Sequence, residues 1–165
     1  MTSVAFIEER VLFSPDIPLE VNNLLQAAVA ASPVDQNRAE TLFLQAQALD
    51  SHCLQTYFAL YKFYFFQKRL VDAERIVLEG LEESAKQGGF PNDYDQLAGN
   101  LQEWNLYANE SSLFYLYTLK ALAFIRLRLG LNLEAQLILS TLQQLDPKDL
   151  SGASVIMDLA AGVTE

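Results

Sequence analysis

The sequence predicts an all-α fold of about eight helices joined by short loops, with no β-strand. Composition is the first reason, because the 165 residues include 29 leucines and 19 alanines but only 7 glycines and 5 prolines. Leucine and alanine lose little conformational freedom in a helix, whereas glycine and proline interrupt it. Periodicity is the second, because apolar residues recur three and four positions apart along most of the chain. We expect one domain with its own hydrophobic core.

The first half of the chain predicts a short N-terminal arm or helix at residues 1–18, followed by four helices. These four helices are expected at Leu19–Ala31, Asp35–Leu49, Leu54–Phe66 and Val71–Gln87. Ser32-Pro33 separates the first two, and Gly88-Gly89 ends the last. The third contains seven aromatic residues and, taken alone, is also consistent with a buried strand. Its length and its place between helices favour a helix that is apolar almost all round.

The second half predicts four more helices. They are expected at Asp93–Ala108, from Ser111 or Ser112 as the cap to Leu129, at Leu133–Leu145 and at Ala153–Ala161. Asp93 and Gln96 have the spacing of a capping box, in which a side-chain oxygen accepts a hydrogen bond from a free amide of the first turn. Gly130 and the Asp146-Pro147 pair are the expected stops of the two helices before the last one.

The charge distribution argues against nucleic acid and membrane as partners. The chain has 21 acidic and 11 basic side chains, for a net charge of −10, and no basic stripe stands out. Nucleic-acid binding depends on clustered Lys and Arg, so we do not expect it. The most apolar stretch, Leu113 to Leu133, is interrupted by Lys120, Arg126 and Arg128, which a membrane span tolerates poorly.

The N-terminus and the cysteine content favour a cytoplasmic protein. A signal peptide has a basic start followed by a long apolar run. The N-terminus lacks this pattern and instead contains Glu8, Glu9 and Arg10, so we do not expect a signal peptide. The single cysteine, Cys53, has no second cysteine in the chain with which to form a disulfide.

No motif for catalysis, metal binding or cofactor binding stands out. The single histidine, His52, adjoins Cys53, and adjacent helical residues point apart instead of converging on a substrate or metal ion. The segment Gly88–Pro91 lacks the Lys-Ser/Thr of a phosphate-binding loop. We therefore expect no enzyme activity, no catalytic residue, no metal ligand and no cofactor.

A repeated helix pattern is the most informative feature of the sequence. Segments that begin at Ala39, Ala73 and Ala135 each start with a small residue, place an apolar one four positions later and a small or apolar one three positions after that. Ala39 and Ala73 are 34 residues apart, and two of the segments end in Leu-Asp. The chain thereby resembles the tetratricopeptide repeat (TPR) family, whose period is about 34 residues.

The resemblance implies a right-handed α-solenoid of stacked helical hairpins. In order, the chain would contain a degenerate unit at 20–51, a unit at 54–86, an insertion at 88–110, a unit at 116–149 and a capping helix at 153–161. The insertion supplies an extra helix, and whether it packs within the stack or across it is left open by the sequence. Stacked hairpins of this kind present an inner surface made by their first helices.

Family geometry places ten residues on that inner surface. They are Gln55, Phe58, Lys62, Phe65, Phe66, Tyr117, Lys120, Phe124, Leu127 and Arg128. Five are Phe or Tyr and three are Lys or Arg, in a strongly acidic chain. This composition suits a groove in which aromatic anchors and flanking cations hold a peptide segment of a partner protein. The resemblance thus implies a protein-binding adaptor or a chaperone-like protein.

Other functions remain open at this point. The aromatic residues are also consistent with core packing, or with the obligate interface of a homodimer or of a larger complex. In length and charge the chain is similar to the small acidic TPR chaperones of bacterial secretion systems. A small-ligand cavity beneath the inserted helix is a further, weaker alternative.

Overall fold

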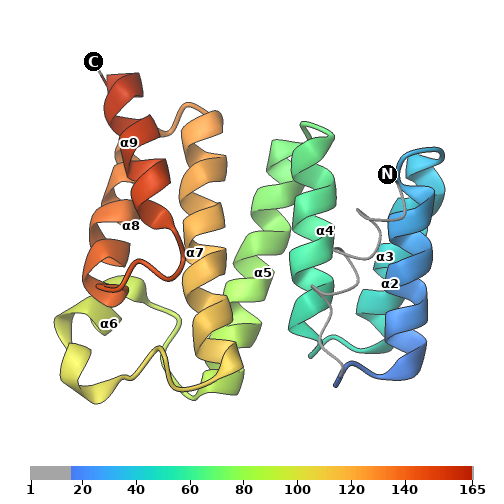
Figure 1. Cartoon of the computed structure of the whole chain (residues 1–165), viewed down its shortest axis with the longest axis horizontal. Coiled ribbons are helices and arrows are strands. Elements are labelled where there is room, and N and C mark those ends of the chain that lie inside the picture. Colours follow the sequence, from blue (N-terminus) through green and yellow to red (C-terminus); the bar gives the residue numbers. More distant parts are fainter. Residues whose placement is uncertain (1–15, 165) are drawn as a thin grey trace. The chain divides into compact units, whose positions relative to one another are not determined.

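A computed structural model of the chain describes residues 16–164, and the side chains of residues 16–161. Eight α-helices and one 3-10 turn, with no β-strand, make up the regular structure of this range (Figure 1), which confirms the predicted all-α class. The predicted arm at residues 1–18 falls almost entirely outside it. The contacts divide the chain into two compact units, Met1–Phe63 and Tyr64–Glu165.

In the first unit, α2 (Leu19–Ala31) and α3 (Gln36–Leu49) pack together as a helical hairpin (Figure 1). Asp35 caps α3, because its carboxylate accepts a hydrogen bond from the backbone N–H of Arg38 at 3.1 Å. The buried side chains of the two helices lie three and four residues apart: Val21, Leu25, Ala28, Ala39, Leu42, Phe43 and Ala46. Helix α4 (Leu54–Phe66) follows, and the Phe63 ring packs 5.1 Å from that of Phe43.

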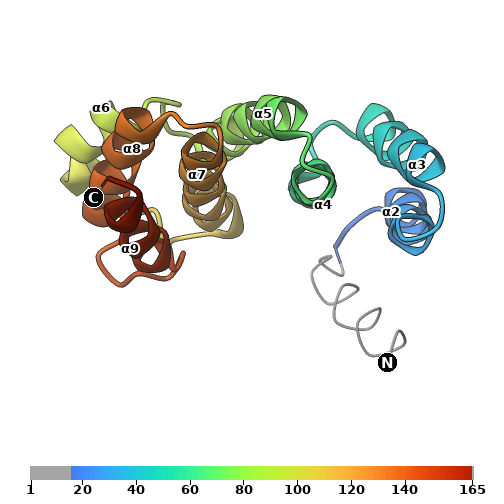
Figure 2. The same ribbon diagram turned by 90° about the horizontal axis from the view of Figure 1, so that it is seen from above.

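The second unit is built around α7 (Glu110–Arg128), which packs against three other helices. These are α5 (Leu70–Gly88), α8 (Asn132–Leu145) and α9 (Ala153–Thr164), and α9 also packs against α8 (Figure 2). The core consists of aliphatic side chains with at most 2% exposure, among them Ile76, Val77, Leu116, Leu119, Leu122, Ile138, Leu139 and Leu142. On α7 and α8 these buried positions follow the three- and four-residue spacing on which the helix prediction rests.

Three helices end in a left-handed residue that closes the last turn. Gly89 after α5 has φ of +74° and Gly130 after α7 has φ of +82°, as expected for glycine stops. After α4 the same position is taken by Lys68, with φ of +62°. There the N–H of Arg69 donates to the carbonyl of Tyr64 at 2.9 Å, which ends α4 abruptly after Phe66. No glycine in the sequence marks this turn.

The prediction of one helix over Asp93–Ala108 is wrong. The structure has a short helix, α6 (Tyr94–Gly99), then a 3-10 turn at Leu101–Glu103 and irregular backbone. Gly99 and Asn100 are poor helix formers, and the Asn100 side chain donates a hydrogen bond to the Gln96 carbonyl at 3.2 Å instead of letting the helix continue. The start of α6 is as predicted, because Asp93 accepts from the Gln96 N–H at 3.1 Å.

The predicted cap of α7 also needs correction. Its N-cap is Asn109, whose side-chain oxygen accepts from the N–H of Ser112 at 2.9 Å. Ser111 donates its hydroxyl to the same oxygen at 2.8 Å. The serines therefore lie inside the first turn, two and three positions after the residue that caps it.

The segment between α5 and α7 packs beside α8 and the first turns of α7. Helix α6 packs against α8, whose other side faces α7 (Figure 2). The ring of Phe90 meets that of Tyr115 edge to face at 5.0 Å, and the Tyr115 hydroxyl donates to Asn92 at 3.0 Å. Leu97 and Leu106 are buried at 0% and 6% exposure, so this short, irregular segment has its own apolar anchors.

Candidate partner-binding surface

Four of the predicted surface residues come together in the second unit. The ring of Phe65, in the last turn of α4, lies 5.2 Å from that of Phe124 on α7 and 5.9 Å from that of its neighbour Phe66. The guanidinium carbon of Arg128, one turn after Phe124, lies 5.7 Å from the centre of the Phe65 ring. We call Phe65, Phe66, Phe124 and Arg128 the aromatic surface.

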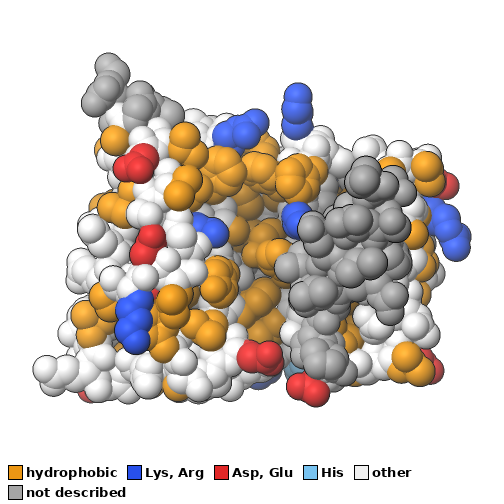
Figure 3. Space-filling model, in the orientation of Figure 1, with side chains coloured by type: hydrophobic (Ala, Val, Ile, Leu, Met, Phe, Trp, Pro, Cys, Tyr) orange, Lys and Arg blue, Asp and Glu red, His pale blue; other side chains and the backbone are white. Residues whose placement is uncertain are grey.

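The aromatic surface is open to solvent in the structure. Phe66 is 71% exposed, Arg128 is exposed, and Phe65 and Phe124 are partly exposed. In Figure 3, hydrophobic side chains run along the front of α7 with Lys or Arg side chains among them. A contiguous group of exposed apolar side chains typically marks an interaction site. Helix α4 ends at Phe66, and the chain turns away at Lys68. Phe65 and Phe66 therefore lie in the last turn of α4, where no further helical residue covers Phe66.

The two arginines of α7 have different surroundings. Arg126 lies between α5 and α8, with its Nε 3.2 Å from a Glu74 carboxylate oxygen and 4.0 Å from one of Glu134. Arg128 has no carboxylate partner among the described residues, and Phe65 is the contact that the structure gives it. Within one turn of α7, therefore, one cation takes part in internal packing and the next is presented to solvent.

Tyr117 and Lys120 lie closer to the start of α7 and form a separate group. Tyr117 is 41% exposed, and the Lys120 amine is 5.8 Å from the centre of its ring. The same amine lies 3.9 Å from the point where a Cβ on Gly152 would stand, at the turn before α9. Burial lowers the pKa of Lys120, although the carboxylates of Asp149 and Asp146 act to raise it. This cation is therefore already close to acidic groups of its own chain.

Leu127 departs from the expected pattern of surface residues. Its side chain is only 8% exposed, so it packs in the interior of the second unit. On a helix, residue 127 lies about 100° around the axis from residue 128, and the packing of the second unit buries it. Leu127 therefore presents little area to a partner.

The remaining predicted residues, Gln55, Phe58 and Lys62, belong to the first unit. The Lys62 amine lies 5.7 Å from the centre of the Phe58 ring, which meets Tyr61 edge to face at 5.6 Å. Gln55 accepts a weak hydrogen bond from the Cys53 thiol at 3.5 Å. Phe58 and Lys62 thus form an aromatic and cationic pair of the first unit, separate from the aromatic surface.

Sequence reasoning missed a polar cluster around Asp146, in the turn between α8 and α9. Oδ1 of Asp146 accepts from the Tyr107 hydroxyl at 2.5 Å and from the Leu150 N–H at 2.9 Å. Oδ2 accepts from the N–H and the hydroxyl of Ser151 at 2.9 and 2.6 Å. Asp146 is 4% exposed and Ser151 is 2% exposed. The sequence marked Asp146-Pro147 only as a helix stop, and nothing near it in the chain indicates Tyr107 as a partner.

The hydrogen bonds of this cluster determine its electrostatics. Burial acts to raise the pKa of Asp146, but hydrogen bonds from Ser151, Tyr107 and the Leu150 amide outweigh it and lower the pKa. The pKa of Tyr107 is raised, first by burial and then by its hydrogen bond to Asp146. Its oxygen also accepts from the Lys148 N–H at 3.0 Å. Every acceptor of the carboxylate is occupied from within the chain, so the cluster is structural.

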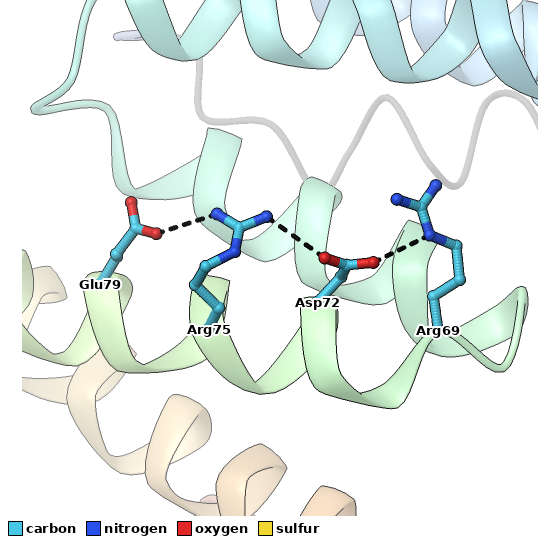
Figure 4. A network of polar contacts seen from close by, with 4 residues as sticks. All are labelled: Arg69, Asp72, Arg75 and Glu79. Carbon is cyan, nitrogen blue, oxygen red and sulfur yellow. Dashed lines mark hydrogen bonds and ion pairs between the residues drawn. The ribbon is translucent and has the colours of Figure 1, made fainter.

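A row of charges on α5 is also structural in character. Arg69, Asp72, Arg75 and Glu79 form successive ion pairs of 3.0, 3.6 and 3.2 Å along one side of the helix (Figure 4). Their side chains are 36% to 52% exposed, and such solvated pairs contribute little to stability. Because each charge already has an opposite charge beside it, the row offers no spare group for a ligand.

The remaining observations assign no other function. No group of three or more metal-ligating side chains occurs among the described residues, His52 is exposed, and Cys53 is buried. No helix in the described range has the length and apolar character to cross a bilayer. No family model, curated protein or solved structure matches the chain. The geometry of its own surface is therefore the basis for a functional proposal.

Proposed function

We propose that the chain is a non-enzymatic protein-interaction module, an adaptor or chaperone-like protein that holds a peptide segment of a partner on the aromatic surface. The observation that carries this proposal is the exposed ring of Phe66 beside the rings of Phe65 and Phe124, which contact each other in a tilted arrangement. Aromatic side chains give a large contact area at low entropic cost and dominate the energetics of many interfaces.

The expected energetics are those of a small, local anchor site. A ring that becomes fully buried against a partner contributes about 1–2 kcal/mol. The aromatic surface offers three adjoining rings, from the last turn of α4 and from α7, whose ring-to-ring contacts are already present before binding. This supports a moderate affinity for an extended or helical segment, in keeping with an adaptor or chaperone in the cytoplasm.

The proposal includes a TPR-like architecture, in which the helical hairpins stack as a right-handed solenoid. It is supported by the packing of α2 on α3, of α7 on α8 and of α8 on α9 in sequence order. It is also supported by the repeat period of the sequence, with α7 and α8 as the first and second helices of the unit at 116–149. In such a stack the residues of α7 that follow Tyr117 at helical spacing belong to the inner surface.

The test is a comparison of three forms of the full chain as baits in the native host. Phe66→Ala with Phe124→Ala removes two anchors, and Leu137→Ala is the matched control, because Leu137 is 68% exposed on α8. Quantitative mass spectrometry should find proteins that the natural chain and the control retain and that the double variant loses at least tenfold. Recovery of the same proteins by all three baits, with the double variant folded by circular dichroism, would contradict the proposal.

Light scattering separates this function from that of an obligate dimer subunit. At low micromolar concentration the protein should be a monomer whose mass does not change in the double variant. A tight dimer that the double variant dissociates would instead assign the aromatic surface to self-association.

A further inference from the structure

Arg128 is an exception among the arginines of its unit. Arg69 pairs with Asp72, Arg75 pairs with Asp72 and Glu79, and Arg126 pairs with Glu74. Arg128 has no carboxylate within ion-pair distance among the described residues. Acidic side chains outnumber basic ones by 21 to 11 in this chain, so an unpaired cation is not explained by a shortage of carboxylates.

The geometry of Arg128 leaves its hydrogen-bond donors available. Its guanidinium contacts the ring of Phe65, with the central carbon 5.7 Å from the ring centre. No oxygen of a described residue accepts a hydrogen bond from the Arg128 side chain, so the N–H donors of its guanidinium have no acceptor in the described part of the chain. Those donors match a carboxylate in a two-point arrangement.

Lys120, the other cation on this side of α7, is less suited to the same role. It is half-buried at the α8–α9 turn, where Asp149 and Asp146 contribute a negative potential. Any ligand carboxylate there would meet those two carboxylates as well. An acidic group of a partner is therefore favoured at Arg128 and disfavoured near Lys120. This difference would orient the bound segment along α7.

Resting on the function proposed above, we infer that the partner segment carries an Asp or Glu side chain beside an aromatic or leucine anchor. The anchor packs on Phe66 and Phe124, and the carboxylate accepts hydrogen bonds from Arg128. The occupant is thus an acidic, apolar peptide segment, and the argument for it is charge complementarity with Arg128, the arginine of this unit to which the described residues give no carboxylate partner.

A second copy of the chain fits this surface poorly. In a twofold interface the same patch meets itself, so the aromatic surface would meet a patch that has Arg128 and no carboxylate. Burying an unpaired guanidinium is costly, and two copies with a net charge of −10 repel each other. A peptide that brings its own carboxylate removes the first cost.

The experiment selects random twelve-residue peptides displayed on phage against the immobilised full chain. We expect enrichment of Asp or Glu within two positions of Phe, Tyr, Trp or Leu. The same selection on Arg128→Glu should favour Lys or Arg at those positions. Arg38→Glu makes the same charge change at an exposed arginine of α3 and should keep the acidic preference. Binding of a selected peptide should weaken about fivefold to tenfold in Arg128→Gln, and also on addition of salt.

The outcomes distinguish this inference from the proposed function. Apolar peptides that depend on Phe66 and Phe124, but show no acidic preference and no response to Arg128→Glu, would overturn the inference and leave the proposed function intact. Absence of enrichment, or peptides that bind the Phe66→Ala, Phe124→Ala variant equally well, would overturn both. Arg128 is exposed and its described contact is with one ring, so circular dichroism should find both Arg128 variants folded.

Discussion

The turn around Asp146 and the aromatic surface are both built against α7, yet they use their side chains in opposite ways. At the turn, a buried carboxylate accepts four hydrogen bonds from Tyr107, Leu150 and Ser151. At the aromatic surface, Phe66 is 71% exposed and Arg128 has no carboxylate partner in the described part of the chain. The difference teaches how to separate the two kinds of site. Side chains whose hydrogen bonds are all made within the chain stabilise the fold, whereas exposed apolar area beside a cation without a carboxylate partner is available to a ligand.

The comparison also explains how an irregular segment is held in place. Tyr107 belongs to the segment between α5 and α7, and it reaches the α8–α9 turn by donating to Asp146 and accepting from the Lys148 amide. One buried carboxylate therefore ties together two loops that lie 39 residues apart in the sequence. Substitutions at this turn should lower the free energy of unfolding and leave the aromatic surface intact. Substitutions of exposed residues at the aromatic surface should weaken partner binding and leave the free energy of unfolding almost unchanged.

The largest expected effect is the loss of the carboxylate. Asp146→Ala leaves two backbone amides and two hydroxyls without their acceptor in a buried turn, and should lower the free energy of unfolding by about 3 kcal/mol. Urea denaturation followed by circular dichroism measures this loss. Asp158→Ala, at an exposed position of α9, is the matched control and should be close to neutral. A loss below about 1 kcal/mol for Asp146→Ala would contradict the claim that the hydrogen bonds of Asp146 stabilise the fold.

Much of the helical framework could be predicted from local sequence signals. Gly89 and Gly130 mark helix ends because few other residues adopt a left-handed conformation without strain, and Asp93 marks a start through its capping oxygen. The signal fails where the chain breaks a local rule. Lys68 adopts the left-handed conformation that glycine usually takes at a helix end, so the sequence does not indicate this end. The polar Asn100 ends α6 inside a stretch whose spacing favours a longer helix.

The candidate surface was only partly accessible to sequence reasoning. Helical spacing places Phe124 and Arg128 on one side of α7, and both lie there. Spacing cannot tell which residues from elsewhere in the chain stand opposite. That Arg126 meets Glu74, 52 residues away, while Arg128 meets a ring and no carboxylate, follows from tertiary packing alone. The burial of Leu127 has the same origin.

A smaller effect is expected from acid, because a protonated Asp146 keeps its shape and loses only part of its bonding. The hydrogen bonds to this carboxylate hold its pKa below the ordinary value of about 3.9 that applies to the unfolded chain. The unfolded state then takes up the proton first, so the stabilisation is complete above that value. It declines as the pH falls from it towards the lowered pKa of the folded state. Stability measured from pH 6 to pH 2.5 should decline less steeply in Asp146→Asn, and parallel curves for the two proteins would contradict the assigned role.

The smallest expected effect on stability belongs to the residue with the largest expected effect on binding. Phe66→Ser removes a ring that is 71% exposed in the last turn of α4, so the free energy of unfolding should change by no more than about 0.5 kcal/mol. Phe90→Ala is the matched control, because that ring is 8% exposed and packs on Tyr115, and its loss should cost about 3 kcal/mol. Thermal and urea denaturation of both variants measure the contrast. If Phe66→Ser proved as destabilising as Phe90→Ala, the Phe66 ring would be part of the core. The exposed apolar area that supports the binding proposal would then not exist.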